Sequence, residues 1–399
     1  MHILMIAPEP FFEPRGTPFS EFHRIRALTS LGHTVDLATY PFGRDVELPG
    51  LSIHRALKPP FLSHVRIGPS WAKIPLNLSL ALTATRLALT RRYDAVHSHE
   101  EGGAIGIVLA AALRVPHLYD MHSSLPQQVA SFDYHAIPGL RTFLGWIERL
   151  MIRRSRAVIV ICPELETTVH RIRPDAPTVC IENSPGSGDA PTPGTGLAVR
   201  RGLGLAPETP VALYTGTFEH YQGLDLLYAA MKILSARRPD ARLVMVGGDR
   251  TQVDAARRQV ARLEIEDAVI FTGQRPAEEI PAYLDAATAL VSPRSTGTNT
   301  PLKIYQYLRS GRPTVATNLR THTQVLSPET AFLADPTPEA FARALEEALC
   351  DVTHASAVGQ RARLLAETRY SEAAYMAKTR DACRLLFDTP RTDAERGIA

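Results

Sequence analysis

Cysteines are few in this chain, and they lie far apart. Among its 399 residues there are four, at Cys162, Cys180, Cys350 and Cys383. None of them forms a CxxC pair, so the sequence suggests neither a zinc site nor a disulfide framework. No cluster of carboxylates, histidines or cysteines is visible either, so no metal ion is expected. We expect four reduced cysteines in the core of a cytoplasmic protein.

Long apolar runs and a strong excess of one charge are also missing. Residues 1–7 are apolar but lack a basic leader, which predicts a buried strand rather than a signal peptide. The most apolar later segment, residues 74–90, contains Asn77 and Arg86 and falls short of the roughly 20 apolar residues that a spanning helix needs. The formal net charge of +3 is small for this length, so no nucleic-acid partner is expected.

Short β-rich runs alternate with longer helical patterns along most of the sequence. The chain is too long for one hydrophobic core, and its hydrophobic content of 45% is enough to build two. The expected strands are residues 2–7, 35–39, 93–97, 117–120, 157–161, 211–215, 242–246, 269–272, 289–291 and 314–317. This alternation predicts an α/β protein with two doubly wound, Rossmann-like parallel sheets, each covered by helices on both faces.

A stretch rich in proline, glycine, serine and threonine interrupts this alternation after residue 182. It lacks apolar periodicity and predicts a linker over residues 184–201. The expected domains are residues 1–183 and 202–370, and a last helix and tail over residues 371–399 could cross back to brace the first domain. Because such sheets bind ligands at the carboxyl ends of their strands, the two domains are expected to face a central cleft.

One segment, residues 292–313, carries the strongest chemical signal. A strand runs into a loop, after which Thr300 is suited to cap a helix and Pro301 to be its first residue. The free N–H groups and the positive end of the helix dipole at such a turn favour a diphosphate. Arg294 and Lys303 could add charge-assisted contacts to the same anion. An ordinary βα unit with solvated side chains explains the spacing equally well.

The helix in this segment resembles that of a known family. Residues 301–316 are similar to the Pro-Leu-Lys-Ile helix and Gly-x-Pro strand of the family-four glycosyltransferases. Further pieces of the family pattern occur in the expected order at residues 3–8, 31–35, 95–99, 120–122, 183–185, 214–216, 223–227, 244–249, 271–273 and 283–293. The resemblance implies a GT-B fold and transfer of a sugar from a nucleotide-diphosphate donor to a carbohydrate or lipid-linked acceptor. It also implies retention of configuration, no metal ion, and a place in glycan, polysaccharide or glycolipid synthesis.

The resemblance further implies which residues form the site. The donor would lie mainly on the carboxyl-terminal domain and the acceptor mainly on the amino-terminal one. We assign catalytic roles to His122, near the reacting sugar, and to Arg294 and Lys303, at the departing diphosphate. Donor contacts are expected at Gly16, Gly216, Thr217, Gln222, Gly247, Gln274, Thr298, Asn299, Thr300, Pro301, Leu302 and Gln306. His99 and Asp120 are candidates for orienting the acceptor, although a local cap or packing contact would explain them too.

Four of these donor positions depart from the family pattern. Thr298 and Gln306 stand where the family commonly has two glutamates, and Thr217 and Gln222 stand where it has an arginine and a lysine. We infer that the remaining cations and the helix N-terminus carry more of the diphosphate charge than usual. The losses leave open a catalytically silent GT-B protein that acts as a partner or sugar-binding subunit. A GT-B epimerase or phosphorylase is disfavoured, because the sequence places no cofactor lysine for a phosphorylase.

Residues 75–92, the later part of segment 61–92, have an apolar face with Arg86, Arg91 and Arg92 at one end. Such a segment could make peripheral contact with the inner face of a membrane. The alternative, which we prefer, is a helix that packs on the first sheet.

Overall fold

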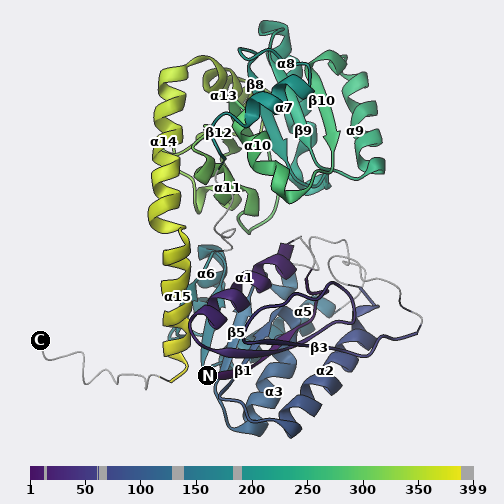
Figure 1. Cartoon of the computed structure of the whole chain (residues 1–399), viewed down its shortest axis with the longest axis vertical. Helices are drawn as coiled ribbons and strands as arrows, with labels where there is room; N and C mark the ends of the chain where they lie inside the picture. Colours follow the sequence, from purple (N-terminus) through teal and green to yellow (C-terminus); the bar gives the residue numbers. More distant parts are fainter. Residues whose placement is uncertain (13–15, 61, 63–69, 128–138, 183–190, 388–399) are drawn as a thin grey trace, which may run out of the picture. The chain divides into compact units, whose positions relative to one another are not determined.

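The chain folds as two compact units. The computed structural model describes residues 1–12, 16–60, 62, 70–127, 139–182 and 191–387. One unit comprises Met1–Asn183 together with Ala373–Ala399, and the other comprises Ser184–Glu372. Each unit has its own parallel sheet, with helices on both faces of the sheet (Figure 1). The predicted fold class, two doubly wound α/β units, is therefore confirmed.

The first unit is built on a seven-stranded sheet in the order β3-β2-β1-β4-β5-β6-β7. All of its strand pairs are parallel. The strands are β1 (His2–Ala7), β2 (Thr34–Thr39), β3 (Leu51–Arg55), β4 (Ala95–His99), β5 (His117–Met121), β6 (Ala157–Val160) and β7 (Thr178–Cys180). Parallel strands that are buried on both faces need apolar runs, and β1 from Ile3 onward is fully buried.

Helices cover both faces of this sheet. They are α1 (Gly16–Ser30), α2 (Lys73–Thr90), η1 (Glu100–Gly102), α3 (Gly103–Leu113), α5 (Leu140–Arg154), α6 (Pro163–Ile172) and α15 (Glu372–Leu385). Buried residues of α2 and α3 pack with Leu4 and Val96 on one face. Buried residues of α1 and α15 pack with Ile3 and Leu118 on the other. The last helix thus completes the first unit, as expected.

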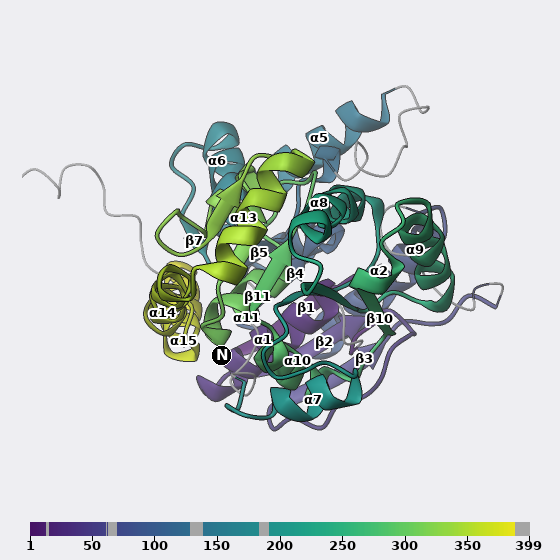
Figure 2. The same ribbon diagram turned by 90° about the horizontal axis from the view of Figure 1, so that it is seen from above.

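The second unit repeats this plan with six parallel strands in the order β10-β9-β8-β11-β12-β13. The strands are β8 (Val211–Thr215), β9 (Arg242–Val246), β10 (Val269–Gly273), β11 (Ala289–Ser292), β12 (Thr314–Thr317) and β13 (Phe332–Ala334). The helices are α7 (Gly196–Gly202), η3 (His220–Gln222), α8 (Leu224–Arg237), α9 (Arg250–Arg262), η4 (Glu266–Ala268), η5 (Ala277–Glu279), α10 (Ile280–Ala286), α11 (Leu302–Ser310), α12 (Arg320–Thr323), α13 (Pro338–Cys350) and α14 (Val352–Arg369). Helices α8 and α13 lie side by side over one face (Figures 1 and 2), and residues of α10 and α11 pack on the other.

The sequence-based boundaries differ from the structure in several places. Strand β4 runs from Ala95 to His99, two residues later than predicted. Strands β3, β7 and β13 were not expected. No residue of β3 or β7 is fully buried, so neither is an apolar run, and β13 is only three residues long. Helix α7 occupies the last part of the segment predicted to be a linker, and residues 183–190 lie outside the described part of the chain.

The expectation of four core cysteines is wrong for two of them. All four are free, and Cys162 and Cys383 are buried. Cys180 is half-buried and Cys350 is exposed at the end of α13. The reason is that a cysteine in an edge strand or in the last turn of an amphipathic helix need not face the core. Among the described residues, no helix is both long enough and apolar enough to cross a membrane.

Candidate functional site

Both sheets reverse their strand order at a central pair, which is β1 and β4 in the first unit and β8 and β11 in the second. The helices that follow the two strands of such a pair lie on opposite faces of the sheet. A crevice therefore opens outside the carboxyl ends of the strands, and ligands of doubly wound sheets bind there. The predicted site residues lie at or near these two reversal points.

In the second unit, glycines end the central strands. Gly216 follows β8 with a φ of 139°, and Gly247 follows β9 with a φ of 126°. A Cβ atom on Gly247 would lie 2.0 Å from the carbonyl oxygen of Gly216, and one on Gly216 would lie 2.9 Å from Lys303 Nζ. Both positions therefore require glycine, because any side chain would collide with backbone or with the lysine.

Lys303 is buried in the first turn of α11. Its Nζ lies 3.7 Å from the centroid of the Tyr214 ring and donates a hydrogen bond of 3.3 Å to Gln222 Oε1. Burial, and then the positive charge of Arg294, lower the pKa of Lys303 well below its ordinary value. Gln222, which replaces the family's lysine, therefore acts as a neutral partner for a different lysine.

Arg294 follows β11 and lies over the Tyr221 ring, with its guanidinium carbon 5.1 Å from the ring centroid. Its Nε donates a hydrogen bond of 2.9 Å to the Thr296 carbonyl oxygen. Burial lowers the pKa of Arg294. Within the described residues, neither Arg294 nor Lys303 forms an ion pair with a carboxylate. Two cations therefore lie close together without a counter-ion, an arrangement that an anion would stabilise.

The helix that follows starts one residue later than predicted. Helix α11 begins at Leu302, and its N-cap is Pro301, with an extended ψ of 135° and no side-chain cap. The expectation that Thr300 caps the helix is wrong, because its Oγ1 is buried and has no hydrogen-bond partner. A residue before proline avoids the helical region, so Thr300 stays outside the helix. Gly311 ends α11 in the left-handed conformation, with a φ of 70°.

Helix α12 holds the loop before α11 from behind, through residues that the sequence reasoning missed. Thr321 Oγ1 donates to the Asn299 carbonyl oxygen, and Gln324 Nε2 donates to that of Thr298, each over 2.6 Å. In a planar trans peptide the N–H points opposite to the C=O. The N–H groups of Asn299 and Thr300 therefore point away from α12.

His322 lies beneath the same loop. One ring nitrogen is 2.9 Å from Ser292 Oγ and the other is 2.9 Å from the Thr317 carbonyl oxygen. Burial lowers the pKa of His322 to about 4, so the ring is neutral near pH 7. Thr317 Oγ1 in turn donates to the Arg294 carbonyl oxygen over 2.6 Å. A connected set of side chains thus fixes the loop that carries Arg294.

The remaining predicted donor residues have no described contact with Lys303 or Arg294. Thr217 and Gln274 are exposed, and Gln306 is half-buried one turn after Lys303. Gly16 is the first residue of α1 in the first unit.

In the first unit, Asp120 on β5 is the centre of a buried polar cluster. Arg24 of α1 donates from Nε to Asp120 Oδ2 over 2.9 Å. Although burial opposes ionisation, Arg24 and the neighbouring histidines hold the pKa of Asp120 well below its ordinary value. Arg24 is also held by α15, since its Nη1 donates to Thr379 Oγ1 and its guanidinium lies over the Tyr375 ring.

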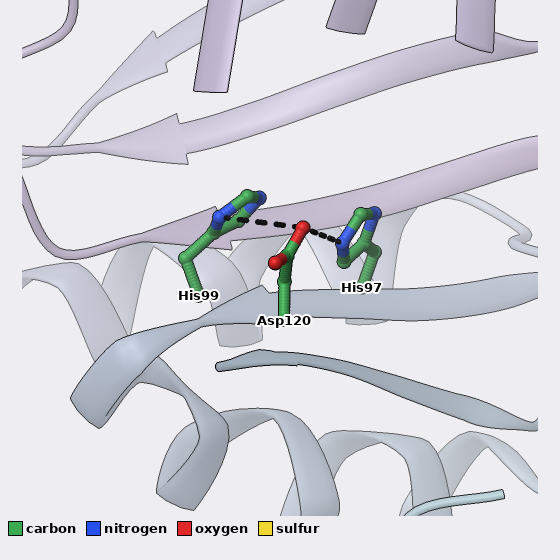
Figure 3. A group of neighbouring side chains, drawn as sticks. All are labelled: His97, His99 and Asp120. Carbon is green, nitrogen blue, oxygen red and sulfur yellow. Dashed lines mark ion pairs between the residues drawn. The ribbon is translucent and has the colours of Figure 1, made fainter. Parts of the chain in front are cut away.

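Two histidines of β4 face the same carboxylate (Figure 3). His97 Nε2 lies 3.4 Å and His99 Nδ1 3.9 Å from Asp120 Oδ2, and the two rings stack with centroids 4.9 Å apart. Residues two apart on a strand share a face, so both rings point to the side that α1 and α15 cover. The expectation that no metal ligands cluster is therefore wrong, because donor atoms of His97, His99 and Asp120 lie within 4.8 Å of one another.

His122, the predicted catalytic histidine, adjoins this cluster. Its Nε2 lies 3.1 Å from Asp120 Oδ1 and 3.2 Å from His99 Nδ1. The structure thus brings together His122, His99 and Asp120, which the sequence analysis proposed separately. The reasoning missed Arg24 and His97, although two histidines at alternate positions of a strand end were a usable signal.

Two buried glutamates complete this edge. Glu100 follows β4 in the left-handed conformation, with a φ of 46°, and Ser123 Oγ donates to both of its carboxylate oxygens. Burial raises the pKa of Glu100 to about 8. Glu21 of α1 is completely buried, and neither of its carboxylate oxygens has a hydrogen-bond partner. Burial, and then the charges of Glu9 and Asp120, raise the pKa of Glu21 well above its ordinary value.

Comparison with known proteins finds two matching family models. "Glycosyl transferase 4-like domain" matches residues 23–183, and "Glycosyl transferases group 1" matches residues 198–365. A D-inositol 3-phosphate glycosyltransferase of Corynebacterium glutamicum is 26% identical over 71% of each chain. A GDP-mannose-dependent alpha-(1-6)-phosphatidylinositol monomannoside mannosyltransferase of Mycolicibacterium smegmatis is 29% identical over 47% of this chain, and the match spans only about half (52%) of that relative.

Solved structures match over almost the whole chain. A sucrose-phosphate synthase of Thermosynechococcus elongatus has a TM-score of 0.77 at 22% identity, and the match covers 97% of this chain and 99% of that one. The HepE protein of Anabaena, solved in complex with UDP, has a TM-score of 0.74 at 17% identity with the same coverage. At these identities the likeness shows the fold alone.

Proposed function

The chain belongs to the GT-B glycosyltransferases of the family-four type, and from that premise we propose that it moves a sugar from a nucleotide-diphosphate donor to an acceptor hydroxyl. The donor would bind at the reversal point of the second unit and the acceptor at that of the first. We further propose that transfer retains the anomeric configuration and uses no metal ion, as the family resemblance implies. The acceptor would belong to glycan or glycolipid synthesis, in keeping with the names of the relatives.

The observation that carries this proposal is the buried cation pair of the second unit. Lys303 has only the neutral Gln222 and the face of Tyr214 as its described partners. Burying an ammonium without a counter-ion is unfavourable, and Arg294 adds a second positive charge. A diphosphate supplies the missing negative charge, because it can accept charge-assisted hydrogen bonds from both side chains.

The same groups suit the departure of the nucleoside diphosphate. As the glycosidic bond breaks, negative charge grows on the leaving phosphate oxygen. Lys303, Arg294 and the N–H groups of Asn299 and Thr300, which point away from α12, could stabilise that charge. Their low-dielectric surroundings strengthen each contact, so the cations would compensate for the basic residues that Thr217 and Gln222 replace.

Sugar recognition would depend on neutral groups. The Gln306 amide can both donate to and accept from ribose hydroxyls, whereas the Thr298 hydroxyl offers one short group. On the acceptor side, His122 would lie near the reacting sugar. Asp120 would fix the His122 ring through the 3.1 Å contact with Nε2, and His99 Nδ1 lies 3.2 Å from the same nitrogen.

Calorimetric titration with a panel of UDP-, GDP- and ADP-sugars tests donor binding. One or more nucleotide sugars should bind the wild-type chain, and Lys303→Met should weaken the best of them by about 30-fold, since a charged hydrogen bond contributes about 2 kcal/mol. Lys232→Met is the matched control, because Lys232 is exposed on α8. Equal affinity in Lys303→Met and wild type would remove Lys303 from the site.

Turnover is tested with the nucleotide sugar that binds. NMR of the product formed on a lipid or glycan acceptor should show the same anomeric configuration as the donor. The rate should not fall after treatment with EDTA. An inverted product would exclude the retaining mechanism, and loss of the rate in EDTA would exclude the metal-free one.

We also propose that α2 contacts a membrane that carries the acceptor. Its buried residues Leu76 and Leu80 pack on the first sheet, in line with the preferred sequence interpretation. The opposite face is apolar and exposed, with Ile74, Leu78 and Leu82 each at least 60% accessible. These residues recur at intervals of four and so form one stripe along the helix. Residues 61 and 63–69 of the predicted membrane-contact segment lie outside the described part.

Charge favours an anionic membrane as the partner of this stripe. Trp71, which is 69% exposed, precedes the helix, and Arg86 and Arg92 are exposed toward its other end. Apolar and aromatic side chains with neighbouring arginines are typical of helices that bind anionic bilayers.

Vesicle flotation with anionic liposomes tests the membrane contact. The double variant Leu78→Ser with Leu82→Ser should bind at least about tenfold more weakly than wild type, because two apolar side chains are lost from the stripe. Leu364→Ser is the control, since Leu364 is equally exposed on α14 of the other unit. Undiminished binding of the double variant would show that α2 is not the contact.

A further inference from the structure

The buried cluster around Asp120 contains an unusual number of unsatisfied polar atoms. In the described part of the chain, both ring nitrogens of His97, His99 Nε2 and both carboxylate oxygens of Glu21 are buried without a hydrogen-bond partner, and His97 Nε2 is the nitrogen that faces Asp120. Buried polar atoms are nearly always paired, so a local concentration of unpaired ones needs a physical explanation such as a bound ion.

The donor atoms around Asp120 are arranged as metal ligands are. His97 Nε2, His99 Nδ1 and Asp120 Oδ2 all lie within 4.8 Å of one another, and His122 Nε2 lies 3.2 Å from His99 Nδ1. Two imidazoles and a carboxylate, with a further imidazole or water, form a ligand set typical of tetrahedral zinc. We propose that the first unit binds a transition-metal ion of the zinc class through His97, His99 and Asp120.

The two strands hold these ligands rigidly. His99 and Asp120 are paired directly across β4 and β5, and His97 lies on the same face of β4 two residues earlier. Strands in the middle of a sheet position side chains more accurately than loops do. A metal ion would need only small rotations of the side chains to bring the donor atoms closer together.

The surrounding charges also fit. Arg24 donates to Asp120 Oδ2 over 2.9 Å, and carboxylates that coordinate metals are usually hydrogen-bonded in this way by an outer group. Its positive charge would oppose the ion, but Glu21 offers compensation. The unpaired Glu21 carboxyl is close enough for the charge of Asp120 to raise its pKa, and a nearby dication would favour its ionised form instead.

The proposed transfer needs no ion at this site, but two of the ligands, His99 and Asp120, also hold His122. Occupancy would draw the Asp120 carboxylate away from His122, so, if the proposed function is right, the ion should inhibit transfer rather than support it. Metal binding itself is independent of that function and is tested separately.

The test uses the full chain without an affinity tag, first freed of metal with a chelator. Titration with Co²⁺ should give one equivalent of bound ion with the visible absorption of a tetrahedral site, and Zn²⁺ should displace it. His97→Gln should weaken binding by about tenfold or more, because a direct ligand is lost. His354→Gln is the control, since His354 pairs with Glu347 on the surface of the other unit and should leave binding unchanged.

A second variant guards against a folding defect in His97→Gln. Glu21→Gln keeps the shape of a side chain that makes no hydrogen bond, so it should fold, yet it should weaken Co²⁺ binding several-fold by removing the compensating charge. Absence of Co²⁺ and Zn²⁺ binding in the wild type would overturn the proposal. Equal affinities in wild type, His97→Gln and Glu21→Gln would overturn it as well.

Discussion

The two units share one strand order but treat buried charge in opposite ways. At the reversal point of the first, a carboxylate is paired with Arg24 and surrounded by histidines whose pKa values are lowered. At that of the second, Lys303 and Arg294 lie together with no carboxylate among the described residues. The comparison shows that this fold specifies where a ligand binds, whereas a few side chains decide the sign of the charge that it meets.

The largest effect should come from breaking the ion pair of the first unit. Arg24→Met leaves Asp120 buried and uncompensated, which should lower the free energy of unfolding of this unit by about 3 to 5 kcal/mol. Amide hydrogen exchange of β5 measures the loss. Adding Asp120→Asn to Arg24→Met should restore part of it, because the unpaired charge is then gone. Two variants with purely additive effects would contradict the pairing.

The next effect is a loss of stability of the second unit at low pH. The pKa of His322 is lowered by burial to about 4 from an ordinary value near 6.5. Between these values the unfolded chain binds the proton that the folded chain excludes, so stability falls as the pH falls. From about pH 7 to about pH 5 the second unit should lose about 2 kcal/mol through this residue.

Hydrogen exchange of β11 and β12, corrected for intrinsic rates, measures this loss. It should be smaller in His322→Gln and unchanged in His354→Gln, because His354 lies on the surface. The same slope in all three proteins would show that His322 does not titrate as its burial implies.

A smaller effect should follow from loosening the donor loop. Thr321→Val keeps the size of the side chain but removes the hydrogen bond to the Asn299 carbonyl oxygen. The loop should lose part of its fixed orientation, and donor affinity should fall about fivefold, equivalent to about 1 kcal/mol. Calorimetry measures this change. Thr368→Val, which removes a similar bond on exposed α14, should bind the donor as wild type does.

The smallest expected effect is the change in stability caused by Lys303→Met, which contrasts with the large loss expected in Arg24→Met. Lys303→Met removes a buried ammonium that has no counter-ion, so the free energy of unfolding should rise or stay within about 1 kcal/mol of wild type. Exchange of β8 amides tests this expectation beside the large loss in Arg24→Met. A loss of several kcal/mol would mean that an anionic group of the chain pairs with Lys303.

Much of the fold could be predicted from the sequence, because the patterns that indicate strands and helix ends are local. Buried parallel strands such as β1 and β8 are mostly apolar runs, and their alternation with longer helical patterns predicts doubly wound sheets. Gly311 was recognisable as a helix end because a left-handed residue there favours glycine. The start of α11 was predicted one residue too early, at Pro301. Proline is common as the first residue of a helix, but it also keeps the residue before it out of the helical conformation, and the two effects competed here.

The polar clusters could be predicted only in part from the sequence, because they depend on contacts between segments that are distant along the chain. Arg24 is one of several arginines in the chain, and only its burial between β5 and α15 sets it apart. Thr321 and Gln324 resemble ordinary surface residues in the sequence. Their hydrogen bonds to the loop that precedes α11 become apparent only when β12 and α12 are packed against that loop.

The placement of α15 has a consequence for biosynthesis. Tyr375 and Thr379, which hold Arg24 in place, are synthesised after the whole second unit, although they belong to the first unit. The amino-terminal segment must therefore wait, with Arg24 only partly held, until α15 has been made and can complete the cluster around Asp120.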